Sequence, residues 1–181
     1  VNLNAQQTST YSETHGNKSV SIRENVGQEG TTVSSGGSTA VTAGRDITTQ
    51  AAPVQATGDL ALNAGRDVNL NTAQESQYSY DEKTKTKKHL FSKTTTHTVT
   101  EDYATTEKAS QLSGDKVSVV ARQVLTVQGS AGVGDGEVTL KAENDANILT
   151  ASDASSSYLQ TETIKSGHEW TGGFCFTMSR S

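Results

Sequence analysis

The clearest pattern along this chain is an alternation of apolar and polar residues with a period of two. In the segment 58–70, apolar side chains stand at positions 60, 62, 64, 68 and 70, and Ala-Gly-Arg-Asp at 64–67 interrupts the alternation. A period of two is typical of β-strands that bury one face. The segment therefore predicts two short strands that meet at a tight corner, where glycine can adopt the positive φ that other residues resist.

The same template recurs along the chain. It fits 39–47, 117–127 and 138–148, and residues 1–4 repeat the pattern of 68–71, so the chain opens inside a fifth unit. A unit of about 20 residues with two or three short strands cannot bury its inner face alone, whereas units stacked as parallel strands share one apolar column per position. The repeats therefore predict an all-β fold, a parallel β-solenoid with coils of about 21 residues.

The segments between the coils repeat as well. Tyr11, Tyr78 and Tyr158 are each followed seven residues later by a lysine, and the second segment alternates on both sides of a turn near 90–92. That segment predicts a β-hairpin too long for one coil, and we expect the insertions to project and to pair with each other or lie along the solenoid. The predicted organisation is a single solenoid fragment, 1–181, with coils around 1–7, 37–52, 58–73, 115–130 and 136–151 and insertions around 8–33, 74–111 and 153–181.

Composition supports a thin core. Leu, Ile, Val and Phe make up only about 18% of the chain, below the roughly 20% at which disorder becomes an alternative. The net charge is only −5, so the high charge of disordered chains is missing. A solenoid interior needs few large side chains, because Val, Ala, Leu and Thr fill it. The composition therefore argues against an ordinary globular enzyme.

Other features narrow the class further. A single cysteine excludes an internal disulfide and a cysteine-based zinc site. No apolar run approaches the roughly 20 residues of a membrane-spanning helix. The acidic balance argues against nucleic acid as a partner. Because the chain opens on Val1 without a start methionine or a signal segment, we expect an excised fragment whose targeting information lies elsewhere.

A family resemblance rests on these motifs. The pattern Gly-Asp-Leu-x-Leu-x-Ala-Gly-Arg-Asp-Val-x-Leu at 58–70, and the tyrosine-rich segment that leads to Lys-Lys-His-Leu-Phe at 87–91, resemble the haemagglutinin repeat of filamentous-haemagglutinin-type exoproteins. The segment 155–177 resembles the same insertion in a divergent form. Later coils depart from the pattern, since Arg122 and Glu143 stand where glycine is expected. The resemblance implies a right-handed parallel β-helix, a filament at the cell surface and no catalysis within the repeats.

The resemblance also implies a function. Such exoproteins leave bacteria by two-partner secretion and include adhesins, haemolysins and effectors of contact-dependent growth inhibition. We therefore expect a non-enzymatic stalk segment, secreted to the outer side of the outer membrane, for cell-surface display, adhesion or delivery of a C-terminal toxin to neighbouring cells. The implied partners are an outer-membrane secretion transporter and a receptor or glycan on the target cell, with no nucleic acid and no membrane span.

Few side chains of this chain are candidates for catalysis or metal binding. The histidines show no metal spacing and are interpreted as solvated or locally bonded, namely His15, His89, His97 and His168. Cys175 alternates with two phenylalanines, which favours a small buried thiol over a nucleophile. The glycine-rich run 132–136 lacks the spacing of a phosphate loop and is interpreted as a turn between coils. No cofactor, metal or catalytic residue is expected.

Two basic groups are candidates for surface recognition. Arg45 and Arg66 should stack on adjacent coils, and such ladders can bind acidic sugars, so a polysaccharide-binding or polysaccharide-cleaving β-helix is the alternative function. An ordinary corner is the favoured interpretation, because the arginine is absent from later coils.

The second group is a basic run in an acidic protein, formed by Lys83, Lys85, Lys87, Lys88 and Lys93. It fits attraction to anionic glycans or lipopolysaccharide. The favoured interpretation is that these lysines keep an exposed hairpin edge from pairing with other chains. A third possible function is a receptor-binding module in which the hairpins of 74–111 and 153–181 carry recognition.

Overall fold

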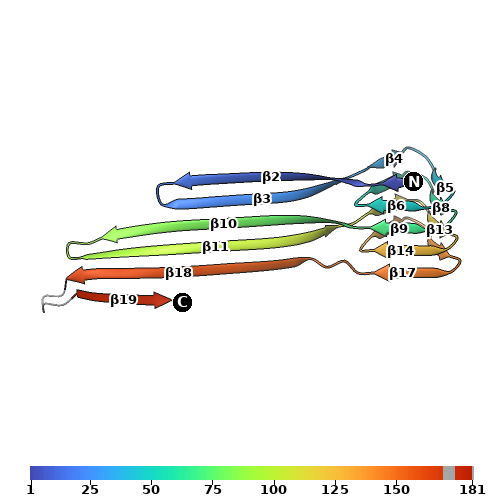
Figure 1. Cartoon of the computed structure of the whole chain (residues 1–181). Coiled ribbons are helices and arrows are strands. Elements are labelled where there is room, and N and C mark those ends of the chain that lie inside the picture. Colours follow the sequence, from blue (N-terminus) through green and yellow to red (C-terminus); the bar gives the residue numbers. More distant parts are fainter. Residues whose placement is uncertain (169–173, 181) are drawn as a thin grey trace. The chain divides into compact units, whose positions relative to one another are not determined.

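The computed structural model describes residues 1–168 and 174–180, in which the regular elements are all β-strands (Figure 1). The all-β class predicted from the alternation is thereby confirmed. The chain divides into two compact units. The first unit comprises Val1–Thr8, Val26–Glu75 and Thr106–Asp153, and the second comprises Ser9–Asn25, Ser76–Thr105 and Ala154–Ser181.

Three parallel sheets make up the first unit. Five strands form one sheet, in the order β1 (Asn2–Leu3), β6 (Ile47–Gln50), β9 (Val68–Asn71), β14 (Val124–Gln128) and β17 (Asp145–Leu149). Four strands form the next, in the order β4 (Val33–Ser35), β7 (Pro53–Ala56), β12 (Gln111–Gly114) and β15 (Ala131–Gly134). Four more form the third, in the order β5 (Thr39–Ala43), β8 (Leu60–Ala64), β13 (Val117–Ala121) and β16 (Val138–Ala142). The chain visits the three sheets in turn, one strand per sheet.

The register between the strands follows the sequence repeat. In the third sheet Leu60 pairs with Thr39 on one side and with Val117 on the other, and Val117 pairs with Val138. These are the offsets of 21 and 57 residues at which the template recurs, so the predicted parallel pairing of the repeated strands is confirmed. Each repeat also contains a strand of the second sheet, such as β7, which the two-strand template does not show.

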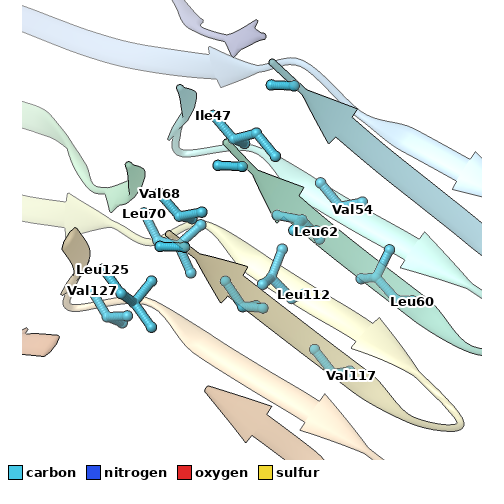
Figure 2. Close-up of a cluster of buried hydrophobic side chains, with 14 of the residues drawn as sticks. Ile47, Val54, Leu60, Leu62, Val68, Leu70, Leu112, Val117, Leu125 and Val127 are labelled. Atoms are coloured by element: carbon cyan, nitrogen blue, oxygen red, sulfur yellow. The ribbon is translucent and has the colours of Figure 1, made fainter. Parts of the chain in front are cut away.

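The core of the first unit consists of the alternating apolar positions together with Val54 and Leu112 of the second sheet (Figure 2). Leu60, Leu62 and Val68 are fully buried, as are their neighbours in the next coil, Val117 and Val119. Each buried aliphatic side chain contributes about 1.5–3 kcal/mol. The column ends at β16 and β17, which are edge strands, and the apolar side chains of these two strands are largely exposed.

The glycine corners differ from the expectation. Among the described residues, positive φ occurs at Ala51 and Gly129 only, so the corner glycines at 44 and 65 do not use it. Space is the physical reason for glycine at 65, because a Cβ there would lie 2.3 Å from the carbonyl oxygen of Gly44 in the coil below. The amide of Gly65 donates to the carbonyl of Ala43, which holds the two corners this close.

The second unit contains most of a six-stranded sheet. Its order is β2 (Ala5–Gly16), β3 (Ser19–Gly30), β10 (Ala73–Lys88), β11 (Ser92–Lys108), β18 (Ala154–His168) and β19 (Phe174–Arg180). Adjacent strands run in opposite directions (Figure 1). The strands are the three predicted insertions, so the expectation that the insertions pair with each other is confirmed.

The hairpin β10–β11 turns where the sequence predicts. The amide of His89 donates to the carbonyl of Ser92, which closes a turn over Leu90 and Phe91. On its other side β10 pairs with β3, where the amide of Thr84 donates to the carbonyl of Lys18. Because β3 begins at Ser19, the part of β10 after Thr84 extends beyond the end of β3 (Figure 1).

Candidate functional site

Three of the candidate lysines share one face of the second unit. Lys83, Lys85 and Lys87 are alternate residues of β10, and side chains two apart on a strand point to the same side. They line a hollow of about 500 Å³ together with a row of threonines from β11, Thr94, Thr96, Thr98 and Thr100. We call this face the lysine–threonine strip. It offers ammonium groups and hydroxyl donors side by side.

The charge of the strip is not neutralised from within. Asp81 also lines the hollow, but its carboxylate is bound by Arg23 at 2.6 Å (Nη2 to Oδ2). Arg23, and then the hydroxyl of Ser21, hold the pKa of Asp81 below its ordinary value. Within the described part of the chain, none of the three lysines forms an ion pair. The strip is therefore cationic.

The fourth lysine lies apart from the strip. Lys88 is an even-numbered residue of β10 and lines a different hollow, of about 430 Å³, with the residues of the turn 89–92. The lysines that form one run in the sequence therefore lie on two opposite faces of β10. Its edge-protection interpretation fits the overhang, because 85–88 extend beyond the end of β3 and form an open strand edge there.

The two arginines belong to the first unit and differ from each other. Arg66 makes a two-pronged ion pair with Asp46 of the adjacent coil, at 2.8 Å from Nε to Oδ1 and 2.5 Å from Nη2 to Oδ2. This guanidinium lowers the pKa of Asp46. Asp67 accepts a hydrogen bond from the amide of Val124 in the next coil. The side chains of Arg66 and Asp67 join successive coils. Of the two candidate arginines, Arg45 is exposed and forms no ion pair with a described residue.

A set of tyrosines and carboxylates escaped the sequence analysis. In β2, Tyr11 donates to Glu13 at 2.7 Å, and the second oxygen of Glu13 lies 2.6 Å from Nε2 of His15. In β10, Tyr80 donates to Glu82 at 3.0 Å, and Glu82 lies 2.8 Å from His97 of β11. The signal available in the sequence was Tyr-x-Glu, which occurs in the first and in the second insertion.

The local-bonding interpretation is thereby confirmed for His15 and His97. The side chains of His168 and Cys175 lie outside the described part of the structure. The glycine-rich run differs from expectation, because its residues 132–134 belong to strand β15 rather than to a turn.

A further hollow of about 480 Å³ was also not foreseen. It lies where small side chains of three neighbouring strands meet, including Ser79, Ala104 and Ser157, and Arg23 and Asp102 border it. Within the described residues, no group of three or more metal-ligating side chains is found. No helix of the described chain is long and apolar enough to cross a membrane.

These features define a class: an all-β repeat protein, in which stacked parallel strands alternate along the chain with paired hairpin insertions. The chain belongs to the hemagglutinin repeat family, whose model matches residues 9–95 and 91–174. The resemblance seen in the sequence motifs is confirmed. No solved structure matches this chain.

Similar proteins are much longer bacterial nucleases. The chain is 49% identical over 179 residues, 99% of its length, to the 16S rRNA endonuclease CdiA of Enterobacter cloacae subsp. cloacae. It is 50% identical over 109 residues, 60% of its length, to the tRNA nuclease CdiA of Yersinia mollaretii. It is 36% identical over 110 residues, 61% of its length, to the deoxyribonuclease CdiA of Dickeya dadantii. The chain spans 5%, 4% and 3% of these relatives, respectively.

Proposed function

We propose that this chain is a non-enzymatic stalk segment of a large secreted bacterial exoprotein. Its three parallel sheets are the faces of a right-handed parallel β-helix with coils of about 21 residues. The coils lie around 1–7, 37–52, 58–73, 115–130 and 136–151, and the hairpin insertions around 8–33, 74–111 and 153–181. The observation that carries the proposal is the residue-by-residue parallel pairing of β5, β8, β13 and β16. With such pairing, each further repeat adds length to the structure.

The relatives support a role without catalysis. Their names give three different substrates, namely 16S rRNA, tRNA and DNA, to proteins that share this segment. A segment that stays similar while the substrate changes is not the part that selects or cleaves the substrate. We infer that the parent protein carries its toxin in another part and uses this segment for surface display, adhesion or toxin delivery to neighbouring cells.

The proposal also names the partners and the cellular location of the parent protein. An outer-membrane transporter exports the parent protein to the outer side of the outer membrane, and a receptor or glycan of the target cell receives it. The hairpin insertions carry the long strands of the segment, and we infer that a receptor binds to these strands.

Deletion in the parent protein tests the proposal. A parent without residues 1–181 should cleave its nucleic acid in vitro at the same rate but should no longer inhibit neighbouring cells in co-culture. The purified segment should cleave none of the three nucleic acids. If the deletion abolished cleavage in vitro while the toxin part stayed folded, the non-enzymatic role would be wrong.

The lysine–threonine strip favours a second role, the binding of anionic glycans. Three uncompensated ammonium groups about 7 Å apart along a strand match a chain of regularly spaced anions. Arg66 does not extend this site, because Asp46 occupies its guanidinium. For the same reason, the polysaccharide-cleaving alternative based on Arg45 and Arg66 gains no support.

Binding of dextran sulfate tests the strip. The triple variant Lys83→Gln, Lys85→Gln, Lys87→Gln should bind at least about ten-fold more weakly than the wild type at low salt. The matched control is Lys18→Gln, Lys116→Gln, Lys141→Gln, which changes the net charge equally at exposed positions. Equal weakening in both triple variants would show that only the net charge matters and would remove the strip as a site.

A further inference from the structure

The six-stranded sheet has a second face, opposite to the lysine–threonine strip. In β10, Tyr78, Tyr80 and Glu82 alternate with the lysines of the strip and therefore point to this second face. Glu82 is bound by His97 of β11, which places the odd-numbered residues of β11 on the same face. These residues include Val99, Glu101 and Tyr103.

The neighbouring strands contribute to the same face. In β3, Arg23 binds Asp81 on the side of the lysines, so the next residue, Glu24, points to the opposite side. In β18, Tyr158 pairs directly with Glu101, and directly opposed residues of an antiparallel pair share one face. We call this surface the tyrosine–glutamate face. Its members are Glu24 of β3, Tyr78 and Tyr80 of β10, Glu101 and Tyr103 of β11, and Tyr158 of β18.

The tyrosine–glutamate face carries negative charge that the chain does not compensate. Glu24 and Glu101 are exposed, and neither forms an ion pair with a described residue. Burial, then Glu101, then Glu24 raise the pKa of Tyr78, so both carboxylates lie close to its hydroxyl. The lysines that β10 and β11 contribute to this face, Lys88 and Lys93, stand at the far end of the hairpin. The face is therefore anionic around Tyr78.

Aromatic rings beside these carboxylates are open to solvent. Tyr103 is 43% exposed and Tyr158 is 52% exposed, and both are neighbours of Glu101. Tyrosine rings attract ammonium and guanidinium groups, and tyrosine is enriched at the centre of protein–protein interfaces. A further strand at either edge of the sheet would widen this face and would not cover it. The exposure of the rings is thus a property of the face and not of an edge.

The separation of the two carboxylates indicates a ligand with several positive charges. Glu24 lies in β3 and Glu101 in β11, and β10 runs between these strands (Figure 1). Neighbouring strands lie about 4.8 Å apart, so the two carboxylates are separated by roughly 10 Å or more. Residues three or four apart in an extended polypeptide are about 10–13 Å apart. A basic polypeptide segment can therefore reach both carboxylates, whereas a small monovalent cation would reach one.

We propose that the tyrosine–glutamate face binds an arginine- or lysine-rich segment of a partner protein. The cationic side chains of this segment contact Glu24 and Glu101 and pack on the rings of Tyr103 and Tyr158. The proposal rests on the receptor role proposed above for the hairpin insertions, and it names the chemistry of the receptor segment. One face of the sheet then takes an anionic partner and the opposite face a cationic one.

Fluorescence anisotropy with a short labelled peptide of alternating arginine and serine tests the role of charge. The 181-residue chain should bind this peptide, and Glu24→Gln, Glu101→Gln should raise the dissociation constant about ten-fold or more at low salt. The matched control is Glu137→Gln, Glu143→Gln, which removes two exposed carboxylates from the first unit and should change the constant less than about two-fold. No binding of the peptide, or equal weakening in both double variants, would overturn the proposal.

The tyrosines distinguish this face from a purely acidic surface. Tyr103→Ala, Tyr158→Ala leaves the net charge unchanged and should still raise the dissociation constant about five-fold or more, because the contacts between cation and ring are lost. Tyr103→Phe, Tyr158→Phe keeps the rings and should bind the peptide nearly as the wild type does. Far-UV circular dichroism checks that each variant is folded. Unchanged affinity in the alanine variant, or spermidine binding as tightly as the peptide, would contradict a polypeptide partner on this face.

Failure of the basic partner can be told from failure of the stalk role. The stalk role is tested by deletion of residues 1–181 from the parent protein and does not depend on peptide binding. If the deletion abolished inhibition of neighbouring cells while the arginine–serine peptide did not bind, the stalk role would stand and the basic partner would be wrong.

Discussion

Thr49 occupies a core position with a polar atom. Its side chain is fully buried between Leu3 and Leu70 of the adjacent coils, and its hydroxyl has no hydrogen-bond partner among the described residues. A buried hydroxyl without a partner costs about 1–3 kcal/mol. Thr49→Val keeps the shape and should therefore raise the free energy of unfolding by about 1 kcal/mol in urea titrations.

Thr72 provides the matched control for this prediction. Its hydroxyl donates to Glu107 at 2.6 Å and is therefore satisfied. Thr72→Val should lower the free energy of unfolding, because the carboxylate of Glu107 then loses this hydrogen-bond donor. If both variants were more stable than the wild type, the added hydrophobicity of valine alone would determine the change in the free energy of unfolding, and the prediction would be wrong.

Leu62 and Leu140 occupy the same column of the third sheet, on either side of Val119. Leu62 is 1% exposed and Leu140 is 42% exposed, because β16 is an edge strand. Leu62→Ala should therefore lower the free energy of unfolding by about 2–4 kcal/mol, and Leu140→Ala by less than about 1 kcal/mol. Similar losses in thermal or urea unfolding would contradict the assignment of the core.

At the scale of elements, cross-strand pairs fix the hairpins. The carboxylate of Glu82 in β10 is bound by His97 of β11 and by Tyr80, and these hydrogen bonds lower its pKa in the folded chain. A lowered pKa means that the stabilisation is fully present above the ordinary glutamate pKa of 4.5 and is lost as the pH falls through the lowered value.

Glu82→Gln should therefore flatten the loss of stability as the pH falls below the ordinary glutamate pKa of 4.5, measured by urea unfolding at each pH. Glu137→Gln, in the exposed turn between β15 and β16, is the matched control for the loss of one carboxylate. An unchanged slope in Glu82→Gln would mean that the hairpin pair does not contribute.

The alternation predicted some elements well and missed others for physical reasons. It located β8 and β9 and the turn at 90–92, because Leu and Val at every second position leave a strong signal. It missed β4, β7 and β12, which are three or four residues long and contain few large apolar residues. The sequence analysis explained glycine at position 65 by a positive φ, and this explanation is wrong. The actual reason is the close approach to Gly44, a contact between two coils that the sequence of one coil does not reveal.

The candidate site was predicted in part. The lysine run is visible in the sequence, and strand parity separates Lys88 from Lys83, Lys85 and Lys87 once β10 is known. The threonine wall of the hollow and the Glu82–His97 pair depend on the register of β10 against β11, which the sequence does not fix. Arg66 was predicted to stack, but its ion pair with Asp46 required the corner geometry.

At the scale of the whole molecule, the connections from the first sheet to the second differ greatly in length. Val127 of β14 pairs with Leu70 of β9, and Ala131 of β15 pairs with Gln111 of β12. Residues 128–130 alone connect Val127 to Ala131, whereas residues 71–110 connect Leu70 to Gln111. Gly129 uses φ 52° for this connection.

Replacement of residues 72–110 by Gly-Ser should therefore leave the coils folded. Far-UV circular dichroism should retain a β spectrum, and thermal unfolding should remain cooperative, because the apolar columns are unchanged. Replacement of 58–71, which removes β8 and β9 from the columns, is the contrasting deletion and should abolish cooperative unfolding.

The order of the strands also determines how the molecule can be assembled. In the first sheet β1, β6, β9, β14 and β17 follow one another as they do along the chain, and in the large sheet β2 to β19 do the same. No strand has to insert between two that are already joined. A chain that emerges from one end can therefore fold as it appears, each new strand adding to a finished edge, and no step waits for a distant segment.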